Sequence, residues 1–388
     1  MILQNLFTYI DWLLFVLVAL TVLYLGFYAL ASLIVRHSDT PKTKRENRFI
    51  ILIPSYKGGK SLERTVKSIL GQSYPQRLFD VTVIADHEDE MTLFHLAQQP
   101  ITLLTPSFEK SSTTKSLQLA INNLPQFKIY DTVLILEAGD VVENEFLESM
   151  NDAYESAGTK AIQAHKLSLN RDTTSARLEA VFEEINNSIF RRGHITIGLS
   201  SALASSGMVF DFNWFKEHIL AANLTWEDKM LEAQLLREHI YVDYFDKIHV
   251  YNEKVRKAEE FNRQHRNYIL THIRTVLRNF RHMPIALFNR QYDLLDKIIQ
   301  WTLLPRMVMM AIIIFMSVVC PAISIAAAFK WWGLIAVILF IFALGTPDYL
   351  VDDKWDSTFM KLPVIVFSSL LEKFKIGRII KEKVNIKQ

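Results

Sequence analysis

An uninterrupted apolar run that ends in two carboxylates constrains the fold of this chain more than any other feature. Residues 133–136 are four branched apolar residues, and Glu137 and Asp140 follow them. A short apolar run with polar ends is typical of a strand that is buried on both faces of a parallel sheet. Ligands of open α/β sheets bind at the carboxyl ends of the strands, so the two carboxylates are candidate ligands for a metal or a polar substrate. The alternative is an ordinary turn at Gly139 with a solvated Glu137.

A charge-free segment near the start of the chain indicates a membrane-attached protein. Residues 12–35 carry no formal charge, and their number suffices for a helix to cross the bilayer. The first ten residues contain no Lys or Arg, unlike a cleaved signal peptide, whereas basic residues follow from Arg36 onward. By the positive-inside rule, we expect the amino terminus outside and the chain after residue 35 in the cytoplasm, as in a protein of the cytoplasmic (inner) membrane.

The composition limits the possible partners. Of 388 residues, 50% are hydrophobic and 22% are charged, with a formal net charge of +2. The chain is therefore too apolar for a purely soluble protein, and it lacks the basic footprint of a nucleic-acid-binding protein. The only cysteine is Cys320, which excludes an intrachain disulfide and agrees with a domain in the reducing cytoplasm.

Residues 48–251 alternate short apolar runs with amphipathic stretches, which predicts an α/β domain with a mainly parallel sheet. We expect three strands to end in polar loops that share one crevice, at residues 54–57, at Asp86 and at residues 137–140. The expected strands are 49–53, 81–84, 101–104, 133–136 and 161–164, and the expected helices include 62–70 and about 91–99.

The carboxyl-terminal part changes character. Residues 279–306 mix basic, aromatic and apolar side chains, which predicts an interfacial helical region. Residues 307–346 are expected to form two spanning helices, 307–329 and 331–344, with the turn at Lys330. Residues 347–388 are expected to form an amphipathic basic tail on the cytoplasmic side.

Seven short motifs follow one another along residues 49–275. They are Ile51-Leu-Ile-Pro-Ser-Tyr, Val83-Ile-Ala-Asp, Lys115-Ser-Leu-Gln-Leu, Leu136-Glu-Ala-Gly-Asp-Val-Val, Ser206-Gly-Met, Trp226-Glu-Asp and Gln264-x-x-Asn-Tyr. In their order and rough spacing the chain resembles membrane-bound family 2 glycosyltransferases, which are similar to cellulose and hyaluronan synthases and have a GT-A fold.

The resemblance implies a site for a nucleotide-diphosphate sugar of the UDP or GDP type. In the family, the first loop and the aspartate after the second strand hold the base and the ribose, and a lysine neutralises the diphosphate. The corresponding positions here are Pro54, Ser55, Tyr56, Asp86 and Lys115. Taken alone, the aspartate could instead cap the next helix and the lysine could be an ordinary solvated side chain.

Two motifs depart from the family pattern. Glu137-Ala138-Gly139 stands where the family has Asp-Ala-Asp, so an implied Mg²⁺ or Mn²⁺ would depend on Glu137 and Asp140, which we expect to project from a strand end. The alternative is a metal-weak site, with the diphosphate neutralised by Lys115 and by Arg263 or Arg266. The Gln-x-x-Arg-Trp signature has become Gln264 to Tyr268, with Arg266 one position early.

The resemblance places catalysis at Glu227 and Asp228, where the family has Thr-Glu-Asp with the aspartate as catalytic base. A carboxylate is suited to take the proton from an acceptor hydroxyl during inverting transfer. The alternative for Asp228 is a helix amino-terminal acid that interacts with the helix dipole. The acceptor and diphosphate side would be formed by Ser206, Gly207, Gln264, Arg266 and Tyr268.

We therefore expect an α/β protein: a GT-A domain at 47–278 behind a transmembrane helix at 1–36, with transmembrane and interfacial helices after it. The expected function is inverting transfer of a sugar to a lipid-linked or polysaccharide acceptor in cell-envelope synthesis. Three spanning helices are few for a polymer channel, which favours a non-processive or homo-oligomeric enzyme. The alternative is a non-catalytic subunit of a polysaccharide synthesis or secretion complex, because two motifs are altered.

Overall fold

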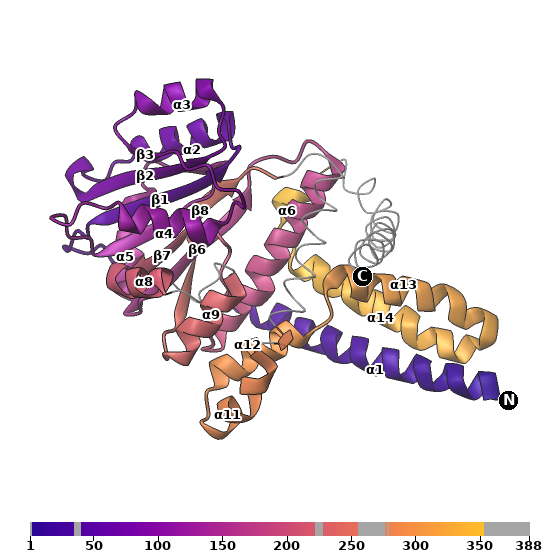
Figure 1. Ribbon diagram of the computed structural model, residues 1–388. Helices are drawn as coiled ribbons and strands as arrows, with labels where there is room; N and C mark the ends of the chain where they lie inside the picture. Colours follow the sequence, from indigo (N-terminus) through magenta and orange to yellow (C-terminus); the bar gives the residue numbers. More distant parts are fainter. Residues whose placement is uncertain (1, 35–39, 222–227, 255–275, 278, 353–388) are drawn as a thin grey trace, which may run out of the picture. The chain divides into compact units, whose positions relative to one another are not determined.

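The chain divides into two compact units in the computed structural model (Figure 1). One unit comprises Ile34–Arg171 and Phe190–Lys254 and contains the sheet, and the other comprises the remaining segments. The structure describes residues 2–34, 40–221, 228–254, 276–277 and 279–352.

The sheet of the first unit has eight strands in the order β3-β2-β1-β4-β7-β6-β8-β5. Strands β3, β2, β1 and β4 run parallel, as do β6 and β8, whereas β7 pairs antiparallel with β4 and β6, and β5 pairs antiparallel with β8. The strands are β1 (Phe49–Tyr56), β2 (Phe79–Asp86), β3 (Thr102–Leu104), β4 (Thr132–Ile135), β5 (Asp140–Val142), β6 (Ala161–Ser168), β7 (Met208–Asp211) and β8 (Val242–Asn252).

Both faces of the central strands are buried, as predicted for residues 133–136. Along β1, Ile51 packs into one hydrophobic core and Ile50 and Leu52 into the other, because successive side chains point to opposite faces. Each fully buried aliphatic side chain contributes about 1.5–3 kcal/mol. The sheet therefore forms the middle layer of the unit and presents only its edges and strand ends for function.

The helices of this unit pack around the sheet. They are α2 (Lys60–Leu70), α3 (Glu90–Ala97), α4 (Thr113–Asn122), α5 (Phe146–Ala157), α7 (Gly193–Thr196), α8 (Phe212–Leu220) and α9 (Asp228–Arg237). Helix α2 buries Leu62, Val66 and Ile69 in the first core, whereas α4 buries Leu117 and Ile121 in the second. The two layers of helices fix the strand ends that form the candidate site.

All five predicted strands are present, with small shifts at their ends. β1 continues through Pro54 to Tyr56 instead of stopping at the proline. The expected mainly parallel sheet is confirmed. The sequence did not predict β5, β7 and β8, and the antiparallel pairings of β5 and β7 make the sheet a mixed one. Each of these strands contains or adjoins charged residues, which obscured the apolar pattern.

The second unit is helical among its described residues. Three of these helices are long and apolar enough to cross a membrane: Asn5–Ala31 within α1 (Ile2–Ala31), α13 (Arg306–Ile323) and α14 (Ile325–Leu344). Helices α11 (Met283–Phe288) and α12 (Tyr292–Thr302) lie in the predicted interfacial region. Helix α6 (Thr174–Asn186) also belongs to this unit, and Arg306 donates a hydrogen bond to its Phe182 carbonyl at 3.2 Å.

The turn between the last two spanning candidates lies at Ser324, so the predicted turn at Lys330 is wrong. The Ser324 hydroxyl accepts a hydrogen bond from Ala327 N and caps α14. Lys330 instead lies within α14 and forms an ion pair with the buried Asp11 of α1. Trp331 also donates its indole N–H to Asp11 at 2.8 Å. A buried carboxylate thus joins α1 and α14.

Candidate functional site

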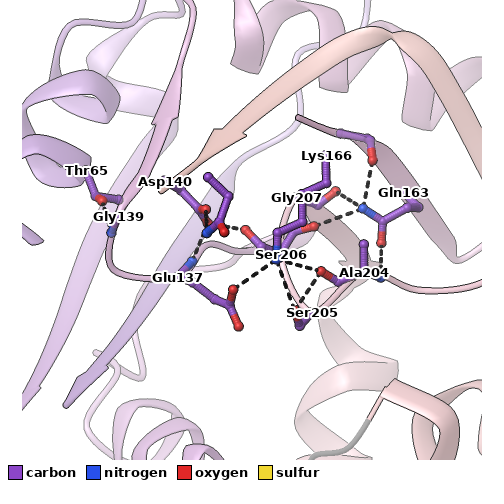
Figure 2. A network of polar contacts seen from close by, with 12 residues as sticks. Thr65, Glu137, Gly139, Asp140, Gln163, Lys166, Ala204, Ser205, Ser206 and Gly207 are labelled. Carbon is purple, nitrogen blue, oxygen red and sulfur yellow. Dashed lines mark hydrogen bonds and ion pairs between the residues drawn. The ribbon is translucent and has the colours of Figure 1, made fainter. Parts of the chain in front are cut away.

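The segment after β4 is a tight turn that Asp140 holds from inside the protein. The Asp140 carboxylate is fully buried, and it accepts hydrogen bonds from Glu137 N at 2.6 Å, from Asn252 Nδ2 at 2.7 Å and from the Ser206 hydroxyl (Figure 2). Gly139 adopts a φ of +102°, a conformation that favours glycine. We expected Asp140 to project from a strand end, but it begins β5 and its oxygens are engaged by protein donors.

Glu137 is the carboxylate that the turn presents. Its side chain is 41% exposed and lies at the carboxyl end of β4, and its Oε2 is 3.1 Å from Lys166 Nζ. Lys166, on β6, is nearly buried and also donates to Ala204 O at 3.2 Å and to Ser205 Oγ at 3.3 Å (Figure 2). Burying an ammonium is costly unless it is paired, so these contacts fix its position. Sequence reasoning missed Lys166, which follows two other polar residues of β6, Gln163 and His165.

The loop before β7 packs closely against the same turn. Gly207 has a φ of +67°, and a Cβ at this position would lie 2.7 Å from Val250 Cγ2. The Gln163 side chain donates to Ser206 O at 2.9 Å and accepts from Ala204 N at 2.8 Å. The Ser206 side chain is buried and turned toward Asp140, so the expected role of Ser206 on the acceptor side stays a prediction.

Asp228, the first residue of α9, shares an electrostatic environment with Glu137. Its side chain is partly buried, and this burial, together with the charges of Glu137 and Glu232, raises its pKa to about 7. Lys166 and Arg191 oppose this effect. A carboxyl group with a pKa near 7 can accept a proton during turnover, because efficient general bases titrate near the operating pH.

Glu232 supports this arrangement from the same helix. Its side chain is buried and accepts a hydrogen bond from Leu203 N at 2.9 Å, which connects α9 to the loop that contains Ser205. Sequence reasoning missed Glu232, because a glutamate four residues after Asp228 looks like an ordinary solvated helix residue.

The ends of β1 and β2 bring together the residues expected to hold a nucleotide base. Tyr56 and Asp86 are paired in the parallel register, and the Tyr56 and His87 rings are 5.7 Å apart. Asp86 is buried, its Oδ1 is 2.6 Å from His87 Nδ1, and its Oδ2 makes no hydrogen bond of good geometry among the described residues. Burial raises the pKa of this carboxyl, but the Ser111 hydroxyl, Phe108 N and His87 outweigh that effect and lower it. A buried acceptor without a hydrogen bond of good geometry is suited to receive a ligand N–H or hydroxyl group.

Lys115 is connected to Asp86 through Phe108. It is exposed at the start of α4, with Nζ 5.8 Å from the centre of the Phe108 ring, and Phe108 N donates to Asp86 Oδ1 at 3.3 Å. Three predicted donor-site residues, Tyr56, Asp86 and Lys115, therefore surround one region.

The first loop is held by a glutamate that sequence reasoning did not select. Glu88 accepts hydrogen bonds from the Ser55 hydroxyl at 2.6 Å and from Gly58 N and Gly59 N at 2.5 and 2.8 Å. Ser55 is therefore engaged in fixing the loop next to Pro54, whereas the side chains of Tyr56 and Lys57 are exposed.

The surroundings of Glu137 and Asp140 do not fit the two-carboxylate metal site that the sequence suggested. Among the described residues, no group of three or more His, Cys, Asp or Glu side chains could hold a metal ion. Asp140 is engaged by three donors, and Glu137 is paired with Lys166. Use of Mg²⁺ or Mn²⁺ stays a prediction.

Four of the predicted site residues lie outside the residues that the structure describes. They are Glu227, Gln264, Arg266 and Tyr268.

Comparison with known proteins identifies related families and folds. Residues 47–268 match the family model described as glycosyltransferase like family 2. No curated protein matches the chain. A similar solved structure is the mannosyltransferase PcManGT from Pyrobaculum calidifontis in complex with GDP-Man and Mn²⁺, with a TM-score of 0.56, 11% identity and coverage of 94% of this chain and 98% of that chain.

A second similar structure is S. aureus TarS 1–349 in complex with UDP-GlcNAc, with a TM-score of 0.43, 14% identity and coverage of 85% of this chain and 92% of that chain. At 11% identity, the likeness to the mannosyltransferase is one of fold alone. The likeness to the mannosyltransferase, together with the family match, confirms the expected GT-A fold.

Proposed function

The chain belongs to glycosyltransferase-like family 2, whose model covers residues 47–268, and we propose that it is an active, inverting glycosyltransferase. The observation that carries this proposal is the carboxyl group of Asp228, whose pKa is raised to about 7 by burial and by Glu137 at the end of β4. Strongly raised carboxyl pKa values are typical of functional sites, since an isolated solvated aspartate has no cause for one.

Asp228 is proposed to act as the general base. The acceptor hydroxyl oxygen attacks the anomeric carbon from the face opposite the leaving group, and its proton passes to the Asp228 carboxylate. The bond between the anomeric carbon and the diphosphate oxygen breaks, and its electron pair leaves with the nucleoside diphosphate. The configuration of the anomeric carbon is inverted, because a single displacement takes place from the face opposite the leaving group.

The donor is proposed to be a nucleotide-diphosphate sugar of the UDP or GDP type. The buried Oδ2 of Asp86 is placed to accept a base N–H or a ribose hydroxyl, and the exposed Tyr56 ring offers a stacking face. Lys115 supplies a positive charge at the edge of the same region. The mannosyltransferase with the similar fold binds GDP-Man, which is consistent with this donor class.

The acceptor is proposed to be lipid-linked or a growing polysaccharide at a membrane. Three helices are long and apolar enough to span a bilayer, which supports a multi-pass membrane protein. We place the catalytic domain on the cytoplasmic side, because basic residues follow the first span. Gln264, Arg266 and Tyr268 are proposed to contribute to the acceptor and diphosphate side, with Glu227 beside the base.

A second candidate function is that of a non-catalytic subunit. It is favoured because Asp140, one of the two expected metal ligands, is already engaged by protein hydrogen-bond donors. The two functions separate in one experiment. The purified full-length protein is incubated with UDP- and GDP-sugars and membrane lipid extract, and release of nucleoside diphosphate is measured beside the Asp228→Asn variant. Enzymatic function predicts release that depends on Asp228, whereas bound donor without any release would favour the non-catalytic subunit.

A further inference from the structure

Lys166 and Glu137 stand out because they form an internal ion pair at the strand end where the donor diphosphate is expected. Lys166 Nζ lies 3.1 Å from Glu137 Oε2, and the Lys166 side chain is 7% exposed whereas that of Glu137 is 41% exposed. A positive charge is therefore built into the site, and the carboxylate that faces solvent is already neutralised.

A divalent ion could not easily take the place of this ammonium. To coordinate Glu137 fully, the ion would have to displace Lys166, which also donates to the Ala204 carbonyl and the Ser205 hydroxyl. The ammonium would then stay buried beside a second cation, without its ion pair to Glu137, which is unfavourable. Asp140 cannot compensate by turning outward, because three donors hold it inside.

We propose that Lys166 serves as the resident cation of the donor site and neutralises the diphosphate, so that transfer requires no divalent metal. This inference rests on the proposed function. As the anomeric carbon–oxygen bond breaks, its electron pair increases the negative charge on the diphosphate, and the ammonium stabilises that charge. The contact of Lys166 with Ser205, at 3.3 Å, is longer than those with Glu137 and Ala204, and a diphosphate oxygen that replaces this neutral hydroxyl forms a stronger, charge-assisted hydrogen bond.

The location of Lys166 agrees with this role. The charges of Lys166 and Glu137 both act on Asp228, so the cation and the proposed base are close enough to interact. Lys166 can therefore stabilise the leaving diphosphate while Asp228 takes the proton of the acceptor hydroxyl. A purely structural ion pair elsewhere in the domain would not couple to the base.

The test measures binding of UDP and GDP to the purified full-length protein by calorimetry, in EDTA and in Mn²⁺. The unaltered protein should bind equally well in both. Lys166→Met should weaken binding in EDTA by about 10- to 100-fold, the usual effect of removing one charged hydrogen bond. Mn²⁺ should restore part of this affinity, because Glu137 is then free to hold an ion. Lys160→Met, at an exposed lysine just before β6, is the matched control and should bind like the unaltered protein.

Two further variants separate charge from folding. Lys166→Arg retains the charge and should keep most of the affinity in EDTA. The double variant Glu137→Gln/Lys166→Met removes both charges with little change of size, so it should fold, bind weakly and gain nothing from Mn²⁺. Melting temperatures are measured on every preparation, so a loss of binding is compared only among folded proteins.

The outcomes distinguish this inference from the proposed function. Nucleotide binding that EDTA abolishes and Mn²⁺ restores in the unaltered protein would overturn the role of Lys166 and leave glycosyl transfer in place. Unchanged binding by Lys166→Met in EDTA would overturn it equally. If neither nucleotide binds the unaltered protein in either condition, the donor class itself is wrong and the proposed function fails with it.

Discussion

Replacement of Asp228 by asparagine tests the proposed general base most directly, because the amide has nearly the same size but cannot take a proton. We expect the turnover rate to fall by roughly 10²–10⁴-fold, the usual contribution of a positioned base. UDP or GDP affinity should change little, since the donor is held by other residues. Turnover and nucleotide affinity are measured on one preparation.

The same substitution should raise stability at high pH. The pKa of Asp228 rises from its ordinary value of 3.8 to about 7 on folding, chiefly because of burial. The folded state therefore binds the proton more tightly than the unfolded chain, and this stabilising contribution is lost as the pH rises from about 4 through 7. The carboxylate then costs about 4 kcal/mol at pH 8, which Asp228→Asn removes. A role in stabilising the helix dipole predicts the opposite sign, a loss of up to about 1 kcal/mol.

The dependence of the turnover rate on pH is a second test of the Asp228 carboxyl group. The deprotonated fraction of Asp228 should increase from about one tenth at pH 6 to about nine tenths at pH 8, so the rate should rise about tenfold across this range. Glu232→Gln removes a neighbouring negative charge that raises the Asp228 pKa, so the acid limb of the profile should move to lower pH. Lys166 and Arg191 act in the opposite direction, and Glu137 in the same direction as Glu232.

A matched control is available at the start of α8. Asp211 accepts a hydrogen bond from Trp214 N at 2.9 Å and caps that helix. Asp211→Asn retains a good cap, so it should alter neither turnover nor the pH–rate profile. Normal turnover by Asp228→Asn, combined with a lowered melting temperature at pH 8, would eliminate Asp228 as the base.

Three further predictions follow from the described contacts and the charge pattern. Asp86→Asn should weaken UDP or GDP binding by about tenfold, measured by calorimetry, because the buried acceptor is lost; unchanged affinity would refute its donor role. Asp140→Asn should lower the free energy of unfolding in urea by about 1–3 kcal/mol, because one of three inward donors loses its acceptor, and an unchanged midpoint would contradict the buried geometry. In a Cys320→Ala background, cysteines at residues 42–48 should be protected from an impermeant thiol reagent added outside, and their reaction would refute the assigned topology.

The central strands could be predicted because their residues are apolar on both faces. Residues 133–136 have no polar interruption, so β4 was evident. β5 could not be predicted, because it begins with the charged Asp140 and is three residues long. Its charge is compensated by Ser206 and Asn252, which come from distant parts of the sequence.

The sequence predicted the site residues that belong to motifs, but it did not predict the residues that contact them. The resemblance selected Glu137 and Asp228, which the structure places in one electrostatic environment. Lys166 escaped because its partner lies 29 residues away and because a register shift after Ala164 disturbs the alternation along β6. A strand pattern cannot tell which face a side chain takes beyond such a bulge.

The ion pair between Asp11 and Lys330 has a consequence for how the protein is made. Its two residues are 319 positions apart, so at about 5–20 residues per second the ribosome completes α14 about 15–60 s after Asp11. During that interval α1 carries a carboxylate whose cationic partner does not yet exist. A chain truncated before Lys330 should therefore leave Asp11 without this cationic partner and α1 less firmly packed in the helical unit.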